Sequence, residues 1–253
     1  PIFVWRQFTY GLAFIGIMIG CISYFSIKSN TNQVANNNIN ILEGLKLLIR
    51  NRTVWLLGFY GAMTYLPLSA VAELWGVPFM RHRFNVSNNE ASICAALMFV
   101  SFGLGSIIAA DVAKKLNSYK KTIILFLIGL IITFWFAIYS NSIGFITCVL
   151  LFSLGSFFAG ANTLSFAMCY DLIPVKYAGT SAGFMNMIVM SSGILFQPLL
   201  GKLLDLFRNG KVTSDGVPLY DINMYRHSFM FIIIGLALAL IAVLYINEQN
   251  KQQ

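Results

Sequence analysis

The sequence predicts an all-α membrane protein with seven transmembrane helices, because of its composition and the way its apolar residues are grouped. Of the 253 residues, 58% are hydrophobic and 10% are charged, whereas charged residues make up about 25% of a typical soluble domain. A soluble globule of this size could not bury so much apolar surface. The composition therefore argues against a soluble enzyme, a disordered chain or a secreted disulfide scaffold, and it indicates a protein dissolved in lipid.

Seven apolar runs have the length of a membrane span, which needs about 20 mainly apolar residues. The runs are continuously apolar and do not alternate, so a closed β-barrel is excluded. In chain order, the predicted spans are Thr9–Ser26, Val54–Val77, Ala91–Ala110, Thr122–Ser140, a segment within Ser142–Tyr170, Ala178–Gly201 and His227–Ile246.

An Asn-rich linker over Ser29–Asn40 separates the first span from an amphipathic segment over Ile41–Arg50. Asn40, with Glu43 three residues later, has the spacing of a capping box and predicts a helix start. One face of this helix would be apolar, formed by Ile41, Leu45, Leu48 and Ile49. We expect the helix to lie on the membrane surface, where lipid phosphates would meet Lys46, Arg50 and Arg52. The alternative is that the segment forms the first turns of the second span.

The connections between spans predict the topology. The fourth and fifth spans are joined by almost nothing around Asn141, so we expect a tight antiparallel pair. The first, third and fifth connections and the tail contain more Lys and Arg than the opposite side. By the positive-inside rule these connections and the C-terminus face the cytoplasm. The net charge of +8 is then explained by topology and anionic lipids rather than by nucleic acid.

No group of residues typical of catalysis or cofactor binding is present. The two histidines, His82 and His227, both lie at predicted membrane boundaries. The sequence has no Gly-rich phosphate loop, no paired-Cys metal site and no nucleophile elbow. We therefore expect neither an enzyme nor a bound metal or cofactor.

The second span contains two candidate functional residues, Pro67 and Glu73. Pro67 removes one backbone donor and can act as a hinge, although prolines are also common in membrane helices without that role. Glu73 is the one carboxylate well inside an apolar run, and polar groups at membrane depth are costly and often functional. We expect Glu73 to exchange protons in a coupling role. The alternative is an ion pair with Arg81 or Arg83 at the outer interface.

Amide side chains occur inside the fifth and sixth spans, at Asn162, Asn186 and Gln197. In lipid such groups need hydrogen-bond partners on another helix or water in a cavity. Both alternatives, contacts between helices and a solute pathway, are open at this point.

The order of these features resembles the major facilitator superfamily, from its sixth to its twelfth transmembrane helix. The tripeptide Val4-Trp5-Arg6 resembles the Gly-Trp-Arg signature before the sixth helix of that family, with Val in place of Gly. The long basic connection after the first span resembles the central loop between the two six-helix halves. The start of the eleventh helix is similar to the stretch from Asp171 to Asn186, which includes Pro174, Gly179 and Gly183.

The third connection resembles the conserved acidic-basic loop of the family. It keeps Asp111 and a basic cluster that includes Lys114 and Lys115, but Ile107 and Val112 replace the glycine and the arginine of the pattern. The resemblance implies that Asp111, Lys114 and Lys115 help to latch one conformation. The alternative is a solvated charge at a helix boundary.

The resemblance implies a secondary transporter with alternating access, whose substrate binds between two halves. Residues 1–27 would be the helix that ends an N-terminal half missing from this chain. A cytoplasmic linker with the amphipathic helix would follow over 28–53, then the six-helix bundle of a facilitator-type fold over 54–246 and a cytoplasmic tail over 247–253. The candidate pathway residues are Tyr60, Thr64, Tyr65, Asn162, Asn186, Ser192 and Gln197.

We therefore expect the C-terminal half of a secondary active transporter that moves a small polar organic solute, with proton symport through Glu73. The expected partners are that solute, membrane lipids and the N-terminal half of the same transporter, and no nucleic acid. The expected location is the bacterial inner membrane. The alternative is a seven-helix receptor or membrane subunit that does not transport.

Overall fold

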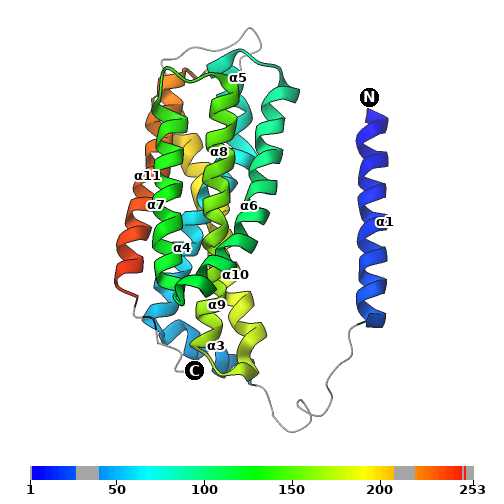
Figure 1. Ribbon diagram of the computed structural model, residues 1–253. Coiled ribbons are helices and arrows are strands. Elements are labelled where there is room, and N and C mark those ends of the chain that lie inside the picture. Colours follow the sequence, from blue (N-terminus) through cyan, green and yellow to red (C-terminus); the bar gives the residue numbers. More distant parts are fainter. Residues whose placement is uncertain (1, 27–39, 208–219, 247, 249–253) are drawn as a thin grey trace. The chain divides into compact units, whose positions relative to one another are not determined.

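The structure, a computed structural model, describes residues 2–26, 40–207, 220–246 and 248 (Figure 1). These residues form helices, and the described ranges contain no strand. The predicted all-α fold class is therefore confirmed. Most of the predicted linker after Ser29 and most of the predicted tail lie outside the described residues. In chain order the elements are α1 (Ile2–Ser26), α3 (Ile41–Arg50), α4 (Arg52–Pro67), η1 (Leu68–Trp75), α5 (Gly76–Phe84), α6 (Asn88–Leu116), α7 (Tyr119–Tyr139), α8 (Phe145–Ala159), η2 (Gly160–Asn162), α9 (Thr163–Asp171), η3 (Val175–Tyr177), α10 (Ala178–Leu206) and α11 (Ile222–Leu244).

Seven membrane-spanning segments are present among the described residues, as the sequence predicts. Their helices extend past the apolar runs, because helical hydrogen bonding continues into the polar boundaries. The second span, for example, covers Arg52–Phe84 rather than Val54–Val77. α1 forms a unit of its own, and the other six spans form the second unit together with α3.

α3 is a separate helix, so the alternative that it is the start of the second span is wrong. Asn40 caps α3 by accepting the N–H of Leu42 at 3.1 Å, a simple Asn cap in place of the predicted capping box with Glu43. Asn51 has an extended backbone that ends α3, and its side chain accepts the N–H of Thr53 at 2.9 Å to start α4.

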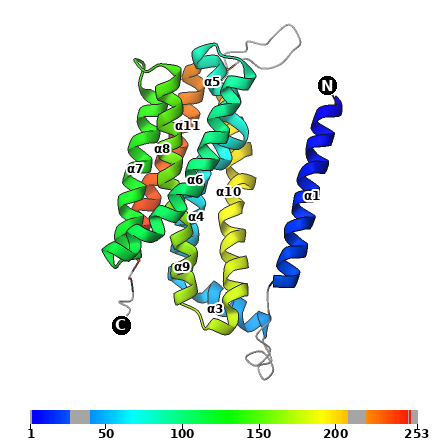
Figure 2. The same cartoon turned by 45° about the vertical axis from the view of Figure 1, so that its right-hand side comes forward.

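The bundle-facing side of α3 differs from the predicted apolar stripe. Gly44 and Leu48 are buried, whereas Ile41 and Ile49 are exposed. A Cβ atom at Gly44 would lie 2.8 Å from the Tyr177 ring, so the glycine allows α3 to approach the start of α10 (Figure 2). Docking on the bundle rather than apolar periodicity decides which residues are covered.

The second span changes its helical geometry directly after Pro67. Proline has no backbone N–H and its ring crowds the carbonyl four residues earlier, and η1 then takes the wider hydrogen-bond spacing of a π-helix. The α-helix resumes at Gly76, whose N–H bonds to the Val71 carbonyl. A Cβ atom at Gly76 would lie 2.3 Å from that oxygen, so this turn needs glycine. The predicted disturbance at Pro67 is present, and its role as a hinge stays a prediction.

The fifth span is also interrupted, at the point where it crosses α6. The chain tightens into the 3₁₀ turn η2 between α8 and α9. A Cβ atom at Gly105 would lie 1.9 Å from the Phe157 carbonyl oxygen, and one at Gly160 would lie 2.5 Å from the Gly105 carbonyl carbon. Two glycines thus bring the α6 and η2 backbones into direct contact.

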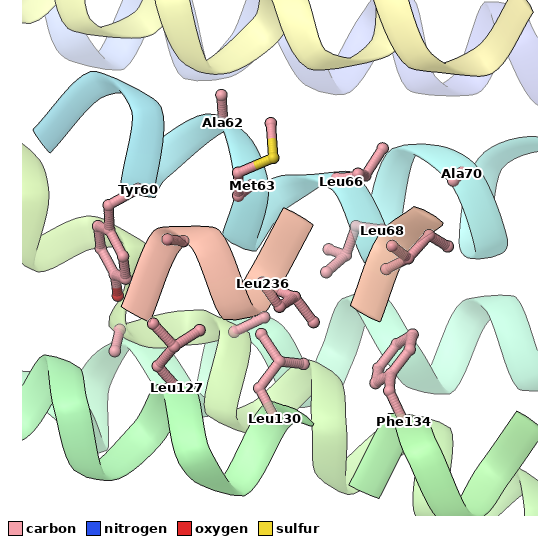
Figure 3. Close-up of a cluster of buried hydrophobic side chains, with 14 of the residues drawn as sticks. Tyr60, Ala62, Met63, Leu66, Leu68, Ala70, Leu127, Leu130, Phe134 and Leu236 are labelled. Carbon is pink, nitrogen blue, oxygen red and sulfur yellow. The ribbon is translucent and has the colours of Figure 1, made fainter. Parts of the chain in front are cut away.

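The core of the bundle lies where α11 passes between α4 and α7 (Figure 3). Met63, Leu66 and Leu236 meet there, and Leu130 and Phe134 of α7 close the other side. These side chains are at most 4% exposed. Dispersion contacts hold them together, because lipid is as apolar as the core and offers no hydrophobic driving force between helices.

Contacts between helix ends show which connections lie at the same end of the bundle. At one end of the bundle the Ser118 hydroxyl, before α7, donates to Glu248, after α11, at 2.5 Å, and α3 packs on the start of α10. At the other end Arg83, in α5, donates to the carbonyl of Ser140, after α7. Successive helices are therefore antiparallel, as the predicted topology requires.

Candidate functional site

A hydrogen-bonded polar cluster, formed by Tyr65, Glu73 and Gln197, lies between the second and sixth spans. The Tyr65 hydroxyl donates to Glu73 Oε1 at 3.0 Å, and Gln197 Nε2 donates to Glu73 Oε2 at 3.0 Å. Gln197 Nε2 also donates to the Ser69 carbonyl oxygen at 2.8 Å. The structure thus brings together three of the residues that the sequence analysis selected separately.

The π-helical turns of η1 determine this arrangement. Tyr65 and Glu73 are eight residues apart, which in an α-helix is a separation of about 12 Å along the axis. The wider turns of η1 rise less per residue and rotate Glu73 toward Tyr65 and α10. They also change the backbone hydrogen-bond pattern after Pro67, and the Ser69 carbonyl in this segment accepts from Gln197. Pro67 therefore helps to build the cluster by changing the local backbone.

Glu73 forms no ion pair in the part of the chain that the structure describes, where the Asp111–Lys114 pair is the single salt bridge. The alternative that Glu73 pairs with Arg81 or Arg83 is wrong, because Arg83 donates instead to carbonyls at the end of α7. Glu73 is exposed on the side of the bundle. An ionised carboxylate facing acyl chains would cost about 3 kcal/mol, so this side fits a water-filled cavity or a protein contact better than lipid.

A shallow groove of about 520 Å³ lies next to the polar cluster. Gln197 belongs to its wall, so the groove is one hydrogen bond away from the Glu73 carboxylate. The remaining wall is mainly apolar and comes from η1 and α10, with the residues Leu74, Trp75, Met190, Gly193, Ile194, Pro198 and Gly201. The sequence analysis did not select these residues, since apolar side chains in a span give no signal that separates a groove from lipid contact.

Three other pathway candidates, Tyr60, Thr64 and Asn162, lie inside the bundle, and two of them form a hydrogen bond between helices. Asn162 of η2 donates to the Gly61 carbonyl at 2.6 Å and to the Thr64 hydroxyl at 2.9 Å. Asn162 and Thr64 are at most 3% exposed, and Tyr60 is 1% exposed. In this conformation these contacts correspond to the alternative of interhelical hydrogen bonding. Their role in a pathway stays a prediction.

The last two pathway candidates lie on α10 and differ in exposure. Asn186 is exposed. Ser192 is fully buried, and its hydroxyl has no hydrogen-bond partner among the described residues. Neither residue joins the cluster around Glu73, so both remain predictions on their own.

The predicted latch residues lie at the end of α6. Lys114 Nζ is 3.8 Å from Asp111 Oδ1, and their side chains are 82% and 58% exposed. Lys115 is exposed as well. A pair so exposed stabilises a helix by at most a few tenths of a kcal/mol, which leaves both charges available to another partner.

α6 and α10 belong to the least buried of the six spans in the bundle. Only 22% of the apolar stretch of each is buried, compared with 78% for the second span. The Glu73 cluster and the groove lie along this side, because α10 supplies Gln197 and most of the groove wall. The side with the least internal packing is therefore also the side with polar groups.

Comparison with known proteins agrees with this geometry. The chain matches the sequence model of the Major Facilitator Superfamily over residues 2–198 and again over residues 57–253. No curated protein matches the chain. The two matches together extend over nearly all of the sequence and all seven spans. The chain therefore belongs to the major facilitator superfamily.

Proposed function

We propose that this membrane transporter chain acts as the C-terminal half of a secondary transporter, which moves a small polar organic solute by alternating access with proton coupling. The main supporting observation is the cluster of Tyr65, Glu73 and Gln197 on a side of the bundle with little internal packing. A carboxylate at this depth is tolerated when it faces a cavity between two halves.

Proton coupling is assigned to Glu73 because of its position and its partners. Its two oxygens each accept one hydrogen bond from a neutral group, so the carboxylate can gain or lose a proton without breaking an ion pair. Tyr65 and Gln197 come from different spans, and movement of α10 relative to η1 would change the contacts of Glu73. Protonation and conformational change would then be linked.

The remaining roles follow the family membership. Tyr60, Thr64, Asn162, Asn186 and Ser192 are proposed to line or shape the pathway at other stages of the cycle. Asp111, Lys114 and Lys115 are proposed to latch one conformation through the other half. We place the C-terminus and α3 in the cytoplasm of a bacterial cell, because the basic residues of α3 and of the α6–α7 connection lie at that end.

A solute-driven proton flux assay tests this proposal. The complete protein is reconstituted into liposomes that contain a trapped pH-sensitive dye, and a panel of small polar solutes is added outside. We expect at least one solute to change the interior pH and the Glu73→Gln variant to lose at least 90% of this flux, because an amide cannot bind and release a proton.

The matched control is Glu43→Gln, which removes an exposed carboxylate of α3 and should leave the flux unchanged. Equal fluxes in the wild type and in Glu73→Gln would remove Glu73 from coupling. The absence of any solute-dependent flux, with uptake of radiolabelled solutes equal to that of empty liposomes, would contradict transport itself.

A further inference from the structure

We propose that the groove beside Glu73 binds an organic cation, with its positively charged nitrogen at Glu73 and its apolar body against the η1 and α10 wall. This inference names the substrate class of the proposed transporter and rests on that proposed function. It follows from the polar atoms that the site leaves free, from the charge of the site and from the chemistry of the groove.

The polar atoms that remain free in the cluster are acceptors. The Tyr65 hydroxyl uses its one proton on Glu73, and Gln197 uses both N–H groups, on Glu73 and on the Ser69 carbonyl. Lone pairs therefore remain on the Glu73 carboxylate, on the Tyr65 oxygen and on Gln197 Oε1. A ligand that complements this arrangement donates hydrogen bonds or carries a positive charge.

The charge of the site selects between these possibilities. Within the described residues no Lys or Arg forms an ion pair with Glu73, and its two hydrogen-bond donors are neutral. An anion would be repelled by the carboxylate, and a neutral solute would displace water from the carboxylate without compensating its charge. A cation compensates the charge directly.

The groove selects an organic cation over an inorganic one. Its volume of about 520 Å³ lies within the range of about 300–1,000 Å³ that is usual for small-molecule sites. Leu74, Met190 and Ile194 give it an apolar surface, and Trp75 adds an aromatic ring that attracts cations through its π electrons. The Trp75 N–H is the one unpaired donor of the groove wall among the described residues, and it is shielded from solvent.

Gln197 is a positioning residue in this proposal. It belongs to the groove wall, and its two donated hydrogen bonds fix the orientation of its amide group. The Glu73 carboxylate is held in one place by the same contacts. The groove and the carboxylate therefore form one site. In this site the ammonium group contacts Glu73, and its apolar substituent contacts the wall formed by η1 and α10.

Equilibrium dialysis of the purified complete protein in detergent tests the proposal. The probe is radiolabelled benzyltrimethylammonium, whose charge does not depend on pH, and protein-free micelles give the background. Benzyl alcohol and phenylacetate are the neutral and anionic probes of similar size. We expect saturable binding of the cation that is at least tenfold tighter than binding of either other probe, and no competition from equimolar sodium or potassium.

Variants separate the charge from the groove. Glu73→Gln should weaken binding of benzyltrimethylammonium at least tenfold, whereas Glu43→Gln should leave it unchanged. Gly193→Leu, which adds an aliphatic side chain to the groove wall where a Cβ atom would lie no closer than 3.7 Å to its neighbours, leaves the carboxylate in place and should also weaken binding at least tenfold. This second variant keeps the test valid if Glu73→Gln is poorly folded.

The inference is overturned if the protein binds no cation above background, if benzyl alcohol or phenylacetate binds as tightly, if sodium or potassium displaces the probe at equal concentration, or if either site variant keeps the wild-type affinity. Its failure is distinguishable from failure of the proposed function, because binding is measured without a gradient. Proton flux that depends on Glu73 with a neutral or anionic solute would contradict the cation site alone. Cation binding without solute-dependent proton flux would contradict the transport proposal alone.

Discussion

Two segments that cross the bundle, α7 and the second span over Arg52–Phe84, differ in where their polar contacts lie along the helix. α7 is a continuous α-helix, and charged side chains of other elements contact it at its two ends. The second span is broken in the middle by η1 and has its polar side chains around that break. Polar contacts at the helix ends therefore hold α7 in place, whereas the polar side chains in the middle of the second span form the candidate functional site.

Both ends of α7 are held by groups that complement the helix dipole. At its start, Glu248 accepts the N–H of Tyr119 at 2.5 Å, a favourable position for a negative charge. At its end, Arg83 donates to the carbonyls of Ala137 and Ser140. Arg226 supports the same end by donating to the Ile138 carbonyl at 3.1 Å. These charged side chains lie at the ends of α7 and are each partly exposed.

The middle of the second span is held by neutral hydrogen bonds instead. Thr64 accepts from Asn162 at 2.9 Å, and the Ser69 carbonyl in η1 accepts from Gln197 at 2.8 Å. Such bonds between membrane helices contribute roughly 1 kcal/mol each, so they can be exchanged at low cost. The same bundle therefore contains a helix held by charged groups at its ends and a segment held by neutral hydrogen bonds in its middle.

The largest effect is expected from Gly76→Val, which changes the residue at which the α-helix of the second span resumes after η1. The new side chain would place Cβ 2.3 Å from the Val71 carbonyl oxygen, so the backbone has to be rebuilt. We expect a loss of about 3 kcal/mol in the free energy of unfolding, measured by SDS titration, together with loss of transport. Gly103→Val is the matched control because nothing lies within 4 Å of its Cβ position, and it should change stability by less than about 0.5 kcal/mol. Equal effects of the two variants would contradict a special geometry at Gly76.

Next in size is Arg83→Met, which removes a clamp from the end of α7. The carbonyls of Ala137 and Ser140 would lose a charged donor, and hydrogen bonds to charged groups contribute about 2 kcal/mol. The same SDS titration should show this loss for Arg83→Met and almost none for Arg81→Met, which removes an exposed arginine two residues away. A loss shared by both variants would point to overall charge rather than to the clamp.

A smaller effect, about 1 kcal/mol, is expected when Asn162→Ala removes the contacts of η2 with the second span. The double variant with Thr64→Ala measures the coupling between the two side chains. We expect the two single losses to sum to more than the loss of the double variant, because both single variants remove the same hydrogen bond. Simple additivity would contradict the bond between these residues.

The smallest effect is expected from Lys120→Met at the start of α7. The Lys120 ammonium donates to the carbonyls of Leu244 and Ile246 at 2.9 and 2.7 Å, at the end of α11. Because the bond to Leu244 is exposed to solvent, unlike those of Arg83, the loss should be about 0.5 kcal/mol, visible as a small decrease in melting temperature. Lys121→Met, at the exposed neighbouring position, should show no decrease. A larger loss than that of Arg83→Met would reverse the proposed order of the two ends.

Some features of the site could be predicted because they depend on local sequence. Pro67 predicted a disturbed helical turn, and Glu73 was identified as a carboxylate within an apolar run. The cap at Asn40 was also visible from its residue type. Each of these signals concerns a residue and its nearest neighbours in the chain.

Other features could not be predicted because their partners are far apart in the sequence. Gln197 lies 124 residues after Glu73, and Arg83 lies 57 residues before Ser140. An ion pair of Glu73 with Arg81 or Arg83 was the alternative that the sequence left open, whereas packing directs the Arg83 guanidinium to helix carbonyls. The groove beside Trp75 was missed, since its apolar wall has the same composition as a lipid-facing surface.

The sequence alone determined the seven spans and the all-α architecture, because the transfer of long apolar segments into lipid and the need for internal backbone hydrogen bonds depend only on residue type and length. The tertiary structure decided which polar groups meet. A hydrogen bond requires two atoms within about 3 Å, and for Glu73 and Gln197 that distance results from the packing of η1 against α10. No pattern within either segment specifies it.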